Sequence, residues 1–198
     1  MSRRWLLLVA LSLCALLVSV YATIFITIMP FVRADLAASH SAMQVGVYVS
    51  LLAFVGAFVP APSRQRVLLV VSAALGLAAF GLATALCAFA LMPSLLIGGR
   101  VLQGLAGAVV LWAGVGLIRA AFPGPELWKA ISVPAVAIVV GLGAGPLVGG
   151  ITDEYLSWRW GFLAGLPLIA VALVAVVVLA AVQGREEISP DMGRYPAR

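Results

Sequence analysis

GLGAGPLVGG, residues 141–150, lies within a long apolar segment and decides how the fold of this chain is interpreted. Gly141, Gly145 and Gly149 recur every four residues, so on a helix they form one face without side chains. No hydrophobic effect drives helices together in lipid, and a face of this kind lets two backbones approach closely. Pro146 removes one backbone donor and bends the helix within this glycine stripe. The stretch therefore predicts a membrane helix that packs tightly against another helix.

The composition indicates the same class of protein. Of the 198 residues, 64% are hydrophobic and 10% are charged, and a soluble domain of this length could not bury so much apolar surface. The net charge of +5 does not indicate nucleic-acid binding, because the basic residues are scattered singly over the expected loops. Cys14 and Cys87 lie in separate apolar runs, without the spacing of a metal site or a disulfide framework. We expect an all-α integral membrane protein that needs no cofactor.

Apolar runs predict six membrane spans, at about residues 5–31, 44–59, 67–90, 95–122, 128–150 and 160–182. Such lengths suit a bilayer core of about 30 Å, with the longer spans tilted or extending past it. Residues 1–182 thus form one six-span domain, with a loop at 32–43 and a flexible cytoplasmic tail at 183–198. The basic start followed by Val20-Tyr21-Ala22 also fits a cleaved signal peptide, although the apolar run continues beyond Ala22.

The basic residues set the expected orientation. With a cytoplasmic N-terminus, Arg33 and Arg159 fall outside and Arg100 falls within a span. The cytoplasmic set is Arg3, Arg4, Arg64, Arg66, Arg119, Lys129, Arg185, Arg194 and Arg198. Because cytoplasmic loops carry an excess of Lys and Arg, we expect a multi-pass protein of the cell membrane with both termini in the cytoplasm.

A second informative pattern surrounds a charge inside the fourth span. Arg100, Gln103 and Gly104 lie three and four residues apart and therefore share one helical face. A charge at this depth is costly unless it is paired or hydrated, which predicts a polar cavity beside it. The alternative is that Arg100 snorkels to the outer membrane surface.

The glycine pattern G-x-x-x-G-P-x-x-G-G, which ends at Gly150, resembles the antiporter motif on the fifth span of the major facilitator superfamily. Ser157-Trp158-Arg159-Trp160 with Phe162 and Pro167 resembles the branch of fourteen-span multidrug efflux proteins. R-x-x-Q-G at Arg100 is similar to the fourth-span motif of the superfamily, whose arginine is associated with proton transfer in the antiporters.

The resemblance implies an N-terminal half of such a transporter, built as a three-plus-three inverted repeat. It further implies a small amphipathic or cationic substrate and, as partner, a second six-span half or a second copy of the chain. In the resembled antiporters the fifth span packs against the other half. We therefore expect a contact of this kind for the motif residues Gly141, Gly145, Pro146, Gly149 and Gly150. Thr23, Thr27, Tyr48 and Gln103 are expected on the cavity wall, although each threonine can equally bond to a carbonyl of its own helix.

Two positions depart from the family pattern. Tyr21 stands where this branch has an acidic residue in the first span, and Pro60 stands where it has an aspartate between spans two and three. All seven carboxylates lie in expected loops or the tail, and Arg100 stays charged at any relevant pH and so cannot be the titrating carrier. A non-transporting membrane partner, an assembly subunit or a truncated remnant therefore remains the alternative function.

The sequence lacks the residue patterns of the enzyme active sites that we considered. His40 is the only histidine, no G-x-S-x-G occurs, and no cluster of His, Cys and acidic residues has metal-ligand spacing. The glycine run is not a phosphate loop, because no Lys-Ser or Lys-Thr pair follows it. We expect a transporter rather than an enzyme.

Overall fold

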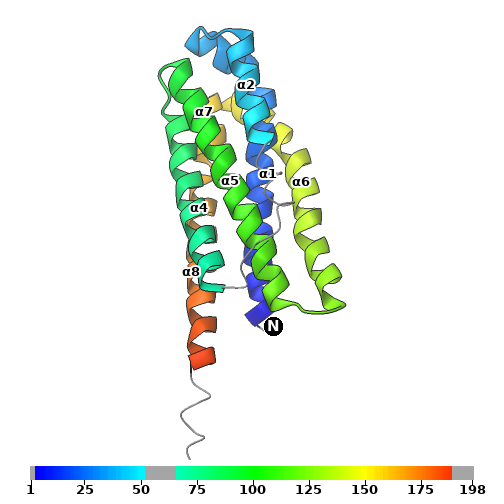
Figure 1. Cartoon of the computed structure of the whole chain (residues 1–198). Coiled ribbons are helices and arrows are strands. Elements are labelled where there is room, and N and C mark those ends of the chain that lie inside the picture. Colours follow the sequence, from blue (N-terminus) through cyan, green and yellow to red (C-terminus); the bar gives the residue numbers. More distant parts are fainter. Residues whose placement is uncertain (1–2, 52–65, 189–198) are drawn as a thin grey trace, which may run out of the picture.

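A computed structural model describes residues 3–51 and 66–188, and every regular element within these two ranges is a helix (Figure 1). The helices are α1 (Arg3–Leu36), α2 (His40–Leu51), α4 (Arg66–Ala88), α5 (Pro93–Ala121), α6 (Glu126–Tyr155), α7 (Trp158–Leu163) and α8 (Leu166–Ile188). Five helical segments of this described part are long and apolar enough to cross a membrane. The all-α class is confirmed. Residues 52–59 of the expected second span, and Pro60, lie outside the described residues.

The first connection is shorter than the loop expected at 32–43. α1 continues to Leu36, and Ala37 ends it with a φ of 48°, in the left-handed region that often terminates helices. Ser39 then caps α2, because its Oγ accepts a hydrogen bond from the backbone N–H of Ala42 at 3.2 Å. The polar residues of this segment thus extend one helix and begin the next.

The sixth span also differs from the expected single helix at 160–182. It consists of α7 and α8, separated by a break at Ala164 and Gly165. Pro167 follows the break, and a proline within a helix lacks a backbone donor and its ring clashes with the carbonyl four residues earlier. At its other end α8 continues to Ile188, so the first residues of the expected tail at 183–198 are helical.

α1 is the central helix of the bundle. It packs against α6 along its length and also contacts α2, α5 and α8, while α4 packs against α5 and α8. Figure 1 shows the N-terminal end of α1 and the C-terminal end of α8 at the same end of the bundle. This arrangement agrees with an even number of membrane crossings.

Ion pairs connect the helices at both ends of the bundle. Arg4 Nη1 lies 2.9 Å from Glu126 Oε2 at one end, and Arg159 Nη1 lies 2.7 Å from Asp35 Oδ2 at the other. Trp158 donates its indole N–H to the same Asp35 oxygen at 3.1 Å. Exposed pairs of this kind contribute about 0–1 kcal/mol, so they orient the helix ends more than they stabilise the bundle.

Candidate functional site

The glycine stripe of α6 faces α1. A Cβ atom added to Gly141 would lie 2.7 Å from the carbonyl oxygen of Leu16, and one added to Gly145 would lie 2.7 Å from that of Val20. At Gly149 the nearest atoms also belong to α1. The two backbones therefore approach each other as closely as the sequence predicted. Within the described chain α1 occupies this face, for which the sequence predicted a contact with a second half.

The other motif residues lie off this face. Around Gly150, as around Gly143, nothing lies within 4 Å of an added Cβ, and Pro146 is exposed. The large apolar side chains that α6 exposes include Val139, Val140, Leu147 and Ile151. This side of α6, which is free of contacts within the described part of the chain, remains open to lipid or to further helices.

Arg100 lies in the centre of the bundle with none of its surface exposed. Its Nη1 donates to the carbonyl oxygen of Tyr21 at 2.9 Å and to Oε1 of Gln103, and its guanidinium lies 4.7 Å from the ring centroid of Phe25. Gln103 in turn donates its Nε2 hydrogen to Thr84 Oγ1 at 2.7 Å. Arg100 therefore does not snorkel to the membrane surface, and it joins α1, α4 and α5.

The Arg100 charge has no counterion among the described residues. Its Nε and Nη2 atoms are buried without a hydrogen-bond partner, and no carboxylate contacts it in this part of the chain. A buried unpaired charge costs several kcal/mol, and a contact with an aromatic face recovers about 2 kcal/mol of that. Gln103 is 2% exposed and Gly104 is also buried, so the whole motif faces inward. A charge kept at such a cost is a candidate functional group.

Tyr21 packs against the break between α7 and α8. Its hydroxyl donates to the carbonyl oxygen of Phe162 at 2.7 Å, its ring lies over Phe162, and a Cβ on Gly165 would overlap it. The glycine therefore makes room for the tyrosine ring beside the break. Sequence reasoning treated Tyr21 only as a missing acid. The signal that it missed is that a tyrosine within an apolar helix needs a partner for its hydroxyl.

We expect Tyr21→Phe to destabilise the bundle by about 1–3 kcal/mol, because the buried carbonyl of Phe162 loses its donor. The measurement is the denaturant midpoint of the purified chain in detergent micelles, followed by helical circular dichroism. Tyr48→Phe is the matched control, because Tyr48 is 63% exposed on α2. Equal midpoints for the two variants would show that the hydroxyl of Tyr21 contributes nothing.

The remaining expected cavity residues do not form a common wall. Thr23 is buried at the contact between α1 and α6, where its Oγ1 lies 3.1 Å from the carbonyl oxygen of Leu142. Thr27 is half-buried beside Gly149. Tyr48 is 63% exposed on α2. The threonines thus belong to helix packing rather than to a cavity.

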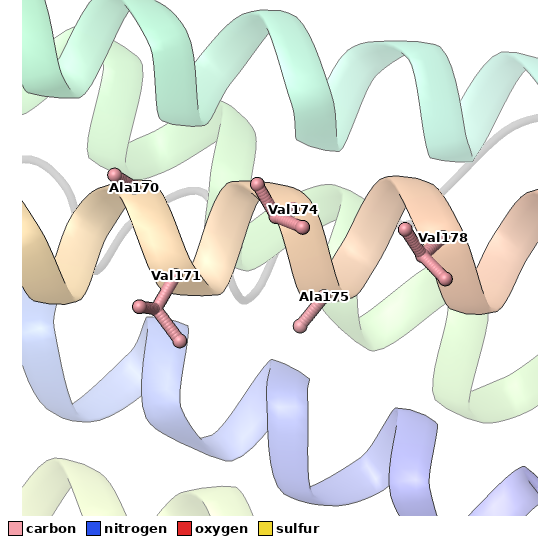
Figure 2. A pocket seen from close by; sticks show the side chains of 5 residues that line it. All are labelled: Ala170, Val171, Val174, Ala175 and Val178. Atoms are coloured by element: carbon pink, nitrogen blue, oxygen red, sulfur yellow. The ribbon is translucent and has the colours of Figure 1, made fainter.

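Two of the hollows on the described surface differ in their chemistry. A cleft of about 310 Å³, here called the α1–α5–α6 groove, is lined by residues that include Leu11, Cys14, Gly114, Arg119, Trp128 and Ile138. A shallower hollow of about 460 Å³ lies on one face of α8, beside Ala170, Val171, Val174, Ala175 and Val178 (Figure 2). The α8 hollow is wholly apolar and lacks the polar groups that orient a ligand. Of these two hollows, the groove between the three helices is the one whose lining includes polar groups as well as apolar ones.

Apolar spans packed around a buried arginine define a multi-pass membrane protein. The family model of the Major Facilitator Superfamily matches residues 11–193, and the chain belongs to that family. It is 35% identical over 170 residues to a probable multidrug-efflux transporter of Mycobacterium tuberculosis (strain ATCC 25618 / H37Rv), a match covering 81% of this chain and 34% of the relative.

Two further relatives are similar in the same way. A multidrug efflux pump of Mycolicibacterium smegmatis is 32% identical over 180 residues, which cover 87% of this chain and 35% of the pump. A puromycin resistance protein of Streptomyces alboniger is 33% identical over 184 residues, which cover 89% of this chain and 36% of that protein. The chain thus spans about a third of the length of these relatives. The resemblance to multidrug efflux proteins that the motifs indicated is confirmed.

Proposed function

We propose that this chain forms one six-span part of a transporter that exports small amphipathic molecules across the cell membrane, and that it has no enzymatic activity. The observation that carries the proposal is the fully buried Arg100, hydrogen-bonded to Gln103 and to the backbone of α1. Structural needs alone do not account for a buried charge without a counterion. The names of the efflux relatives support export as the direction.

A second set of helices completes the proposed transporter, as a second half or as a second copy of this chain. The open side of α6 supports this part of the proposal, because it exposes Val139, Val140 and Leu147. A titrating group for proton coupling would also come from there, since Arg100 does not release its proton. The alternative function, a membrane partner that does not transport, is favoured by the position of all seven carboxylates outside the spans expected from the sequence.

The test is a chimera in which this chain replaces the segment that it matches in the Mycolicibacterium smegmatis pump. We expect cells that express the chimera to accumulate less ethidium than cells with an empty vector. Their ethidium level should rise to that of the vector when a protonophore is added. A chimera that is inserted at normal levels and never lowers ethidium accumulation would favour the non-transporting alternative.

Both termini are proposed to lie in the cytoplasm. The ends of α1 and α8 lie at one end of the bundle, where Arg4 and Glu126 form their ion pair and where the cytoplasmic set of basic residues was expected. Alkaline phosphatase fused after Arg198 should be inactive, because it folds only outside the cytoplasm. A fusion after Ala38, in the turn between α1 and α2, should be active. The reverse result for the two fusions would overturn this orientation.

A further inference from the structure

The α1–α5–α6 groove has the size of a small ligand site. Its volume of about 310 Å³ lies at the lower end of the range of about 300–1,000 Å³ in which drug-sized ligands are buried. The groove is open because α5 carries no side chain at Gly114, where the nearest atom to an added Cβ is Leu11 Cδ2 at 3.8 Å. Leu11, Leu111 and Ile138 make its walls apolar. An alkyl or aromatic body therefore fits inside.

The charge at the mouth of the groove is positive. Arg119, in the last turn of α5, is the charged residue among those that line the groove, and it is exposed. No ion pair joins Arg119 to a carboxylate within the described ranges, and Glu126, the acid nearest in sequence, is paired with Arg4 at 2.9 Å. Trp128 lines the same groove and is 76% exposed. A free guanidinium thus stands beside an indole above an apolar cleft.

From this arrangement we propose that the groove binds a single-chain amphipathic molecule with an acidic headgroup, as a further class of cargo of the transporter proposed above. The chain of the ligand lies against Leu11 and Gly114, and its carboxylate or sulfonate accepts hydrogen bonds from Arg119. A cationic amphipath would meet the like charge of Arg119 and no carboxylate of the groove lining. The groove therefore favours acidic amphipaths, and the cationic cargo that the family resemblance implied is expected to bind outside it.

Binding to the purified full chain in phosphatidylcholine nanodiscs tests the proposal directly. The probes are 11-(dansylamino)undecanoic acid and the matched amine, in which an ammonium replaces the carboxylate. Energy transfer from tryptophan to the dansyl group reports binding, and Trp128 in the groove is a nearby donor. We expect the acid to bind at least tenfold more tightly than the amine.

Two groove variants and two matched controls distinguish the effect of the Arg119 charge on binding from the effect of the groove shape. Arg119→Gln should weaken acid binding about tenfold and remove the difference between the two probes, as expected for the loss of one hydrogen bond to a charged group. Gly114→Leu should abolish binding of both probes by filling the groove. Lys129→Gln removes a neighbouring charge that does not line the groove, and Gly98→Leu adds the same side chain to open space on α5. Both controls should bind the acid like the unaltered chain.

Three results would overturn the proposal: equal or tighter binding of the amine, binding unaffected by Gly114→Leu, or displacement of the acid by a few per cent of phosphatidylglycerol. The last would show that a membrane phospholipid occupies the groove. The assay needs no transport, so its outcome is independent of the chimera. A chimera that exports ethidium while the chain fails to bind the acid would reject the acidic cargo and leave the transporter proposal standing.

Discussion

Gly145→Ala is expected to separate α1 from α6, although it adds a single methyl group. The added carbon would lie 2.7 Å from the carbonyl oxygen of Val20 and 2.9 Å from the backbone nitrogen of Ile24, and closer still to Thr23 Oγ1. Two of these three atoms belong to the α1 backbone and cannot rotate away, so the helices must move apart. Overpacking typically costs about 1–3 kcal/mol, and we expect the upper part of that range here.

The measurement for Gly145→Ala is the denaturant midpoint of the purified chain in detergent micelles. Gly143→Ala is the matched control, because it lies on the same helix with nothing within 4 Å of the added carbon. Its midpoint should equal that of the unaltered chain. If both variants unfold at the same midpoint as the unaltered chain, the close approach of α1 and α6 does not stabilise the fold.

The glycine stripe shows how far the sequence could predict the packing. Spacing by four identified the face of α6 and its close contact, but spacing on one helix does not identify the partner helix. The partner carries its own signal, since Ser19, Thr23 and Thr27 recur every four residues on α1 and lie opposite the three glycines. Closely packed membrane helices typically have small residues on both facing surfaces. Read together, the two stripes would have placed α6 on α1.

The sequence predicted which residues share a helical face with Arg100, but not how deeply that face is buried. The periodicity placed Arg100 and Gln103 on one helical face, and the structure brings them together by a hydrogen bond. The periodicity could not show whether that face lies at a surface or in the core, because its burial depends on α1 and α4. The contacts of Arg100 with the Tyr21 carbonyl and of Gln103 with Thr84 cross between helices. No local pattern encodes contacts of that kind.

Replacing Arg100 with methionine is expected to separate stability from transport. Methionine fills a comparable apolar volume and removes a buried charge whose desolvation costs several kcal/mol. It also leaves Gln103 Oε1 and the Tyr21 carbonyl without the donor that they have in the structure, which costs about 1–3 kcal/mol for each group left unsatisfied. These two effects are similar in size and opposite in sign. We therefore expect a denaturant midpoint that is unchanged or raised.

Transport, unlike stability, should be lost in Arg100→Met. In the chimera with the Mycolicibacterium smegmatis pump, Arg100→Met should bring ethidium accumulation to the level of the empty vector, because no other charge lies at this depth of the described bundle. Arg100→Lys is the control for charge alone. Its compact ammonium cannot reproduce the planar fork that reaches both Tyr21 and Gln103, so it should restore little of the transport. Normal efflux by Arg100→Met would show that the arginine only fills space, and a strongly lowered midpoint would show that it holds the helices together.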